Sequence, residues 1–325
     1  MSKIIFADSF NLTNEAEEDI KKLGQVFSLS LQEREKLVSE SRDADIIIAE
    51  YALIDREIIE NAEFLSGIVV YGVGVNHIDL TAASRKGIPV VNCKGGNAEG
   101  VAELAISLML ECLRKTGQSN AFVRSGKWKN ADSASLPSWM NGRELKGKKL
   151  GILGAGAIGT RVGELGEAFG MQVVVSAGRK NTHSRFNWVP IEELLSDSDI
   201  VSVNLPLVPE TEGLLSRERL ALMKSGSLII ITSRGGIVDE NALAEMLFSG
   251  HLSGAGIDVF REEPLPLDSL LLSAPNAVLT PHMGGSTLES VENISGIISA
   301  SCKLLIEGKN PPTTVNLEML QHYGH

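Results

Sequence analysis

Cysteine is scarce in this sequence. The 325 residues include three cysteines, Cys93, Cys112 and Cys302, which lie far apart and in apolar or helical surroundings. A disulfide framework or a thiolate metal site needs more cysteines, or cysteines at short spacings. We therefore expect three reduced thiols and no metal site, as is usual in the cytoplasm.

An excess of positive charge is also missing. The chain has 30 Lys and Arg residues against 41 Asp and Glu, a formal net charge of -11 and a pI near 5.1, which argues against a nucleic-acid or anionic-membrane surface. No segment approaches about 18 uninterrupted apolar residues, and the N-terminal residues enter a predicted strand without an apolar leader. We expect a soluble, cytoplasmic protein without nucleic-acid or membrane partners.

The length and the 43% hydrophobic content suffice for two domains. Short β-rich runs alternate with amphipathic stretches throughout. The predicted strands are residues 3–7, 26–29, 45–49, 67–71 and 89–92, then residues 149–153, 172–175, 200–205, 228–232, 254–259 and 278–280. Nearly continuous apolar strands that alternate with helices predict parallel sheets covered on both faces. The predicted fold class is α/β, with two doubly wound parallel-sheet domains.

Two long helical patterns divide the chain. One spans residues 98–124, and the other spans residues 287–306 and precedes a tail, residues 311–325, that reads as irregular. Since no strand remains for a third sheet, the C-terminal end is expected to return to the first domain. The predicted domains are residues 1–97 with 289–325 and residues 98–288.

A glycine pattern marks the start of the second series. Gly154, Gly156 and Gly159 form GxGxxG between a predicted strand and a predicted helix. The first glycine allows a tight turn, the second lets backbone approach a pyrophosphate, and the third lets helix pack on strand. The alternative is a glycine-rich turn in an ordinary α/β unit. The predicted cofactor loop is Gly154, Ala155, Gly156, Ala157, Ile158 and Gly159.

Arg234, Glu263 and His282 each come shortly after a predicted strand of the second series. Because parallel strands end at one edge of a sheet, we expect these side chains at the same edge. Arg234 is suited to bind a carboxylate through two hydrogen bonds and to polarise the neighbouring carbonyl. His282 is suited to exchange a proton with a hydroxyl group, and Glu263 to hold the imidazole and favour its charged form. Singly, each also fits a turn or surface residue; together they predict the reduction of a 2-oxo acid beside a nicotinamide.

The order of GxGxxG, TSRGGIVDE, GIDVFREEP and LTPHMGGST along nearly the whole chain resembles the D-isomer-specific 2-hydroxyacid dehydrogenases. The resemblance implies a flavodoxin-like substrate (catalytic) domain made from both chain ends and an inserted Rossmann nucleotide-binding domain. It also implies a cleft between the domains and a homodimer formed mainly through the nucleotide-binding domain.

The resemblance supplies roles for further residues. The loop Val73, Gly74, Val75 and Asn76 is similar to the family's substrate loop, whose main-chain amides help to bind the carboxylate. Asp258 is similar to the acid that holds the nicotinamide carboxamide, and Pro206 and Thr232 match positions that line the cofactor. Each of these residues also fits an ordinary turn or strand end.

The end of the second nucleotide-domain strand departs from the pattern for NAD. An acid is expected there for the ribose hydroxyls, about 20 residues past the glycines, but the sequence has Ser176, Arg179 and Lys180. These residues favour NADP(H) over NAD. The alternative is that Arg179 and Lys180 form a solvated turn.

The resemblance also reduces the number of candidate substrates. Glu263 stands where related formate dehydrogenases carry Gln, and residues 72–76 lack the Lys of phosphite dehydrogenases. Glu50 stands where phosphoglycerate dehydrogenases bind phosphate with Arg, and an acid there would repel a phosphorylated substrate. Glyoxylate or hydroxypyruvate reduction is the first prediction. The alternatives are 3-phosphoglycerate dehydrogenase activity, reduction of a bulkier 2-oxo acid against Tyr51 and Leu53, and a nucleotide-sensing protein similar to the corepressors that share this fold.

Overall fold

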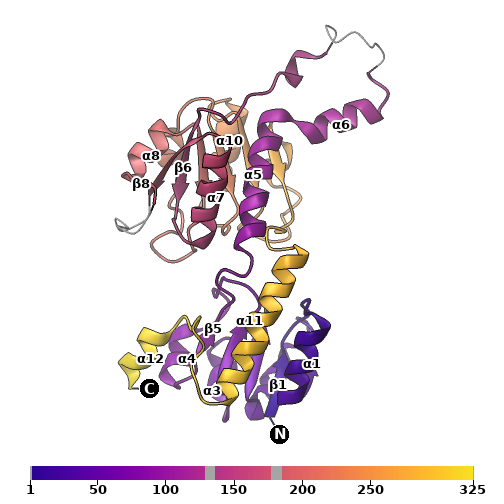
Figure 1. Cartoon of the computed structure of the whole chain (residues 1–325), viewed down its shortest axis with the longest axis vertical. Helices are drawn as coiled ribbons and strands as arrows, with labels where there is room; N and C mark the ends of the chain where they lie inside the picture. Colours follow the sequence, from indigo (N-terminus) through magenta and orange to yellow (C-terminus); the bar gives the residue numbers. More distant parts are fainter. Residues whose placement is uncertain (1, 129–135, 177–184, 325) are drawn as a thin grey trace. The chain divides into compact units, whose positions relative to one another are not determined.

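A computed structural model describes residues 2–128, 136–176 and 185–324. The chain divides into two compact units, Met1–Asn97 with Ser286–His325 and Ala98–Gly285 (Figure 1). The second boundary falls three residues before the predicted one. Within the described ranges, no helix combines the length and the apolarity needed to cross a membrane.

The first unit contains a five-stranded parallel sheet in the order β2-β1-β3-β4-β5. This is the flavodoxin-like strand order. Its strands are β1 (Ser2–Phe6), β2 (Gly24–Ser28), β3 (Ile46–Ala49), β4 (Gly67–Val70) and β5 (Val90–Val91).

Helices cover both faces of this sheet, because successive apolar residues of each strand point to opposite sides. Ile5 packs with residues of α2, α3 and α4 on one face, and Ile4 packs with residues of α1 and α11 on the other. The helices of the unit are α1 (Asn14–Leu23), α2 (Arg34–Glu40), η1 (Ser41–Asp43), α3 (Arg56–Asn61), α4 (Leu80–Arg85), α11 (Leu288–Ile306) and α12 (Leu317–Tyr323).

The second unit contains a seven-stranded parallel sheet in the order β12-β11-β10-β9-β6-β7-β8. The order reverses between β6 and β9, which is the switch point of a Rossmann fold, where ligands bind beyond the strand ends. Its strands are β6 (Lys149–Leu153), β7 (Gln172–Ser176), β8 (Asn187–Trp188), β9 (Ile200–Val203), β10 (Leu228–Ile231), β11 (Gly254–Ile257) and β12 (Ala277–Leu279).

This sheet is also covered on both faces. Residues of α5 and α7 pack on one side, and residues of α8, α9 and α10 pack on the other. The helices of the unit are α5 (Ala98–Arg114), α6 (Thr116–Arg124), η3 (Ser138–Met140), α7 (Ala157–Ala168), α8 (Ile191–Asp197), α9 (Arg217–Ala221), α10 (Glu240–Phe248) and η4 (Leu270–Ser273).

Three local features differ from the sequence-based expectation. The single helix predicted over residues 98–124 is two helices, because Lys115 adopts a left-handed conformation (φ 52°) and the Glu111 carboxylate accepts a hydrogen bond from Gly117 N at 2.9 Å. The two-residue strand β8 was not predicted. The tail predicted as irregular contains α12, whose Leu320 is buried.

Candidate active site

The glycine loop joins β6 to α7, and each glycine does something different there. Gly154 has φ +96°, and a Cβ atom on it would lie 2.8 Å from the carbonyl oxygen of Asn204. A Cβ atom on Gly159 would overlap the carbonyl oxygen of Gly154, so α7 starts directly against the turn. A Cβ atom on Gly156 would meet no described atom within 4 Å. Gly154 and Gly159 are therefore required by the fold, and Gly156 borders open space.

That open space lies at the N-terminus of a twelve-residue helix. Gly156 is the N-cap of α7 and provides no side-chain cap, so backbone N–H groups of the first turn remain for another acceptor. Together with the positive end of the helix dipole, they form a site suited to phosphate. The loop therefore fits the pyrophosphate of a dinucleotide.

Other residues predicted to line the cofactor lie at neighbouring strand ends. Ser176 ends β7, is 7% exposed, and accepts a hydrogen bond from Gly154 N through its carbonyl oxygen at 2.8 Å. Pro206 follows β9 and accepts a hydrogen bond from the Thr211 hydroxyl at 2.6 Å. Thr232 follows β10 and is buried. Arg179 and Lys180 lie outside the described residues.

Among the described side chains, Thr232 Oγ1 and Asn204 Oδ1 are buried polar atoms without a hydrogen-bond partner. Both lie just beyond the ends of neighbouring strands, β10 and β9, and Asn204 is adjacent to Gly154 at the switch point. Buried polar atoms usually have partners, so these two fit a ligand with polar groups. Asn204 was missed by sequence reasoning because the predicted strand, residues 200–205, includes it, whereas β9 ends at Val203; a polar residue inside an apolar run is the signal that could have found it.

His282 and Glu263 form a direct pair. The imidazole Nδ1 lies 2.6 Å from Glu263 Oε2, and the other carboxylate oxygen, Oε1, accepts a hydrogen bond from Phe260 N at 2.9 Å. The two side chains are 30% and 32% exposed, so a small substrate can reach them. This arrangement leaves Nε2 of His282 for proton exchange.

The surroundings favour the charged form of Glu263. Partial burial on its own would raise the pKa of the carboxyl group. The hydrogen bonds from His282 and Phe260 N, together with the positive charges of His282 and Arg234, outweigh that effect and lower the pKa of Glu263 below its usual range. The positive charge of Arg234, the third predicted catalytic residue, contributes to this lowering of the pKa of Glu263.

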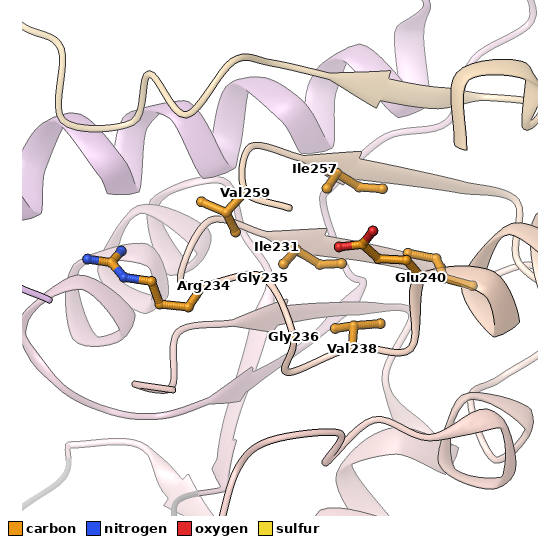
Figure 2. A pocket seen from close by; sticks show the side chains of 9 residues that line it. Ile231, Arg234, Gly235, Gly236, Val238, Glu240, Ile257 and Val259 are labelled. Carbon is orange, nitrogen blue, oxygen red and sulfur yellow. The ribbon is translucent and has the colours of Figure 1, made fainter. Parts of the chain in front are cut away.

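Arg234 lies on the turn after β10, beside a small pocket whose lining is mostly apolar (Figure 2). Its Nη1 donates a hydrogen bond to Ser233 O at 2.7 Å. The next residue packs tightly, because a Cβ atom on Gly235 would overlap the carbonyl group of Phe260. The segment that carries Arg234 is therefore fixed against the segment that carries Glu263.

Glu240 lies on the other side of this pocket. Figure 2 shows its carboxylate directed toward Ile231 and Ile257, and the guanidinium of Arg234 directed away from them. Glu240 Oε1 accepts a hydrogen bond from Arg261 N at 2.6 Å, and burial raises the pKa of Glu240. Glu240 thus holds the loop that leads to Glu263. The sequence gives no signal for this contact, because the two residues belong to different strand–helix units.

Asp258 fixes the segment that contains His282. It is 1% exposed, and its carboxylate accepts hydrogen bonds from the Thr280 hydroxyl at 2.6 Å and from Met283 N and Gly284 N at 2.9 Å each. These contacts hold His282 in a left-handed conformation (φ 51°), which is uncommon for residues with a side chain. The predicted contact of Asp258 with a nicotinamide carboxamide stays a prediction.

The predicted substrate loop lies in the first unit and follows β4. Gly72 has φ +133° and accepts a hydrogen bond from Cys93 N at 2.7 Å, and Asn92 Nδ2 donates to Val73 O at 2.7 Å. Val75 O accepts from Ile78 N at 3.0 Å. Carbonyl groups on both sides of Gly74 are therefore held by the unit itself.

In the described parts of the chain, no group of three or more His, Cys, Asp or Glu side chains is placed to hold a metal ion.

Known proteins are similar to this chain in sequence and in fold. The family model of the NAD binding domain of the D-isomer specific 2-hydroxyacid dehydrogenases matches residues 106–284. A glyoxylate reductase of Pyrococcus furiosus is 37% identical over 293 residues, 89% of this chain and 87% of the relative. A D-3-phosphoglycerate dehydrogenase of Methanocaldococcus jannaschii is 34% identical and covers 98% of this chain, which spans 60% of that relative.

A solved structure of an acyclic imino acid reductase in complex with NADPH and D-Arg is similar with a TM-score of 0.89 at 26% identity, covering 96% of this chain and 99% of the other. The strand order and the glycine loop agree with the nucleotide-binding fold that this family model describes. The chain belongs to the D-isomer-specific 2-hydroxyacid dehydrogenases and is an oxidoreductase that uses a nicotinamide cofactor.

Proposed function

We propose that the protein reduces a small unphosphorylated 2-oxo acid, glyoxylate or hydroxypyruvate in the first place, to the D-2-hydroxy acid with NADPH. One observation carries the proposal: the imidazole of His282 is held at Nδ1 by Glu263 at 2.6 Å, and the charge of Arg234 acts on Glu263. This is the arrangement that a proton donor to a carbonyl oxygen requires.

The residues divide the work as follows. Residues 154–159 would hold a nicotinamide cofactor, which would supply the hydride when bound. Arg234 binds the substrate carboxylate with its planar fork and polarises the carbonyl group. His282 donates a proton from Nε2 to the carbonyl oxygen, and Glu263 holds the ring through Nδ1 and stabilises its positive charge. In the first unit, the loop Val73, Gly74, Val75 and Asn76 is the segment that we propose to bind the substrate carboxylate through main-chain amides.

Preference for NADPH rests on the residues beyond β7. Ser176 occupies the strand end where an acid would bind the ribose hydroxyls of NAD. Arg179 and Lys180, three and four residues after Ser176 in the sequence, would supply positive charge for a 2'-phosphate.

The choice of a small, uncharged substituent rests on the segment after β3. Glu50 places a carboxylate there, close enough to Tyr71 to help raise the pKa of the phenol to about 12, although burial contributes more. A phosphorylated 2-oxo acid would face this negative charge. Tyr51 and Leu53 are 55% and 54% exposed, which favours a bulkier apolar 2-oxo acid as the second candidate.

The partner that we propose besides the substrate is a second copy of the chain. In the nucleotide-binding unit, α6 has no buried residue, and Val123 and Trp128 are 51% and 53% exposed. Such side chains suit a homodimer interface.

The three cysteines are buried, free thiols. Reduced thiols of this kind suit a protein of the cytoplasm.

The experiment follows nicotinamide absorbance with NADPH and with NADH against glyoxylate, hydroxypyruvate, pyruvate and 3-phosphohydroxypyruvate. We expect faster turnover with NADPH and with the first two acids. Preference for 3-phosphohydroxypyruvate would establish phosphoglycerate dehydrogenase activity instead. No turnover with any acid, together with tight nucleotide binding, would point to a bulkier substrate or to a nucleotide sensor.

A further inference from the structure

The first unit contains a buried carboxylate to which neither the fold comparison nor the catalytic scheme gives a role. Asp8 follows β1 and is 3% exposed. Its Oδ1 accepts a hydrogen bond from Glu50 N at 3.0 Å, and its Oδ2 accepts from Tyr51 N at 2.7 Å and Ala52 N at 2.5 Å. Three successive amides of the segment after β3 therefore converge on one side chain.

This convergence fixes where the segment leaves the sheet. The ladder between β3 and β4 ends with the hydrogen bond from Tyr71 N to Ala49 O at 2.9 Å. From Glu50 onward the amides turn to Asp8 instead of to a neighbouring strand. Because three consecutive peptide planes are set, the directions in which the Glu50 and Tyr51 side chains leave the backbone are set as well.

The far end of the segment is tied to the predicted substrate loop. Ile54 N donates a hydrogen bond to His77 O at 2.9 Å, and Asp79 N donates to Ile54 O at 3.0 Å. Hydrogen bonds therefore hold this segment at both ends. Asp8 binds its N-terminal end, and residues 77–79, directly after the substrate loop, bind its C-terminal end at Ile54. Both ends belong to one unit, so this geometry is internal to it.

We propose that Asp8 is the positioning residue that sets substrate choice by holding Glu50 and Tyr51 in place beside the substrate loop. It acts through backbone amides and does not touch the substrate. The proposal rests on the proposed function, since it assigns a discriminating role to residues at the same site. The substituent on the 2-oxo acid, and not its carboxylate or the cofactor, is what Asp8 controls.

The test compares Asp8→Asn with a matched control. Asparagine retains one acceptor oxygen and loses the other, so the three amides cannot all be satisfied. The control is Asp45→Asn. Asp45 Oδ2 accepts a hydrogen bond from Lys3 N at 2.7 Å, near the N-terminal ends of β1 and β3, whereas Asp8 lies beyond the C-terminal end of β1. The readout is the ratio of kcat/KM for hydroxypyruvate to that for 3-phosphohydroxypyruvate, together with nucleotide Kd.

We expect Asp8→Asn to change this ratio about tenfold, mainly through KM, because a small misplacement of contact groups has effects of this size or larger. Nucleotide Kd should not change, and Asp45→Asn should keep the wild-type ratio. An unchanged ratio in Asp8→Asn, or an equal change in both variants, overturns the proposal.

Hydrogen exchange at the amides of residues 50–52 gives a second readout that needs no turnover. We expect faster exchange there in Asp8→Asn and not in Asp45→Asn. Wild-type protein that reduces none of the acids would refute the proposed function, while unchanged exchange in Asp8→Asn would refute the positioning role by itself.

Discussion

At the scale of single residues, the His282–Glu263 pair depends on backbone contacts as much as on the two side chains. Phe260 N anchors one oxygen of Glu263, which leaves the other for the imidazole. Asp258 holds the backbone on the His282 side. The pair is therefore pre-organised, and its orientation does not depend on a substrate.

Replacement of Glu263 by Gln tests the charge of this pair. The amide can still meet Nδ1, but it cannot stabilise a protonated ring, so we expect kcat to fall by about 100-fold with little change in nucleotide Kd. Steady-state kinetics and a nucleotide titration measure both. The control is Glu262→Gln, which removes the same charge from the adjacent exposed position; an equal loss of kcat there would contradict the assignment.

The same variant tests how the stability of the folded protein depends on pH. The folded protein lowers the pKa of Glu263, so its stabilising contribution is fully present above the usual value of about 4.3 and is lost as the pH falls through the folded pKa. In urea unfolding, wild type should exceed Glu263→Gln in stability near neutral pH, and the difference should shrink in acid below about pH 4. A difference that is constant over this range would contradict it.

Sequence reasoning can find residues whose side chains are themselves able to take part in catalysis. Arg234, Glu263 and His282 were chosen because each is a charged or titratable residue shortly after an apolar strand; the structure pairs His282 with Glu263, and the catalytic roles stay predictions. The anchoring roles of Asp8 and Glu240 were not predictable, since each carboxylate meets backbone amides of a segment distant in sequence, 42 to 44 residues away for Asp8 and 21 for Glu240. Backbone amides carry no signature in a sequence.

At the scale of elements, the turn between β6 and α7 separates the needs of the fold from those of the ligand. We expect Gly159→Ala to lower the melting temperature of the ligand-free protein, because its Cβ atom would overlap the Gly154 carbonyl oxygen. Gly156→Ala should leave that temperature nearly unchanged, because no described atom lies within 4 Å of the added carbon.

Both substitutions should weaken nucleotide binding. For Gly156→Ala we expect a loss of tenfold or more, about 1.4 kcal/mol or above, because the added methyl group would occupy the space for the pyrophosphate. Thermal unfolding without nucleotide and fluorescence titration with NADPH measure the two effects. Unimpaired nucleotide binding by Gly156→Ala would show that the pyrophosphate lies elsewhere.

Most of the strands were predictable, because fully buried parallel strands such as Ile46–Ala49 and Leu228–Ile231 are short apolar runs between turn residues. The break at Lys115 was not, since lysine is a good helix former and the cause is a contact of Glu111 with Gly117. The strand β8 is two residues long and has no period to detect.

At the scale of the whole molecule, the proposed homodimer is open to a paired test. We expect wild type to sediment as a dimer and Val123→Glu to sediment as a monomer, because a buried, unpaired carboxylate opposes association. The control is Leu31→Glu in the other unit, where the side chain is similarly exposed, 52% against 51% for Val123. A wild-type monomer, or dimers of both variants, would contradict the assignment of the interface.

The helix α11, which packs on one face of the first sheet, is encoded after the entire nucleotide-binding unit. During synthesis, the N-terminal strands leave the ribosome first, yet the face that carries Ile4, Ile46 and Ile48 has no α11 to cover it until residues 288–306 emerge. At the usual rates of translation this delay is roughly ten to forty seconds. The uninterrupted nucleotide-binding unit can complete its core during that time, so the half of the protein that starts first is the half that finishes last.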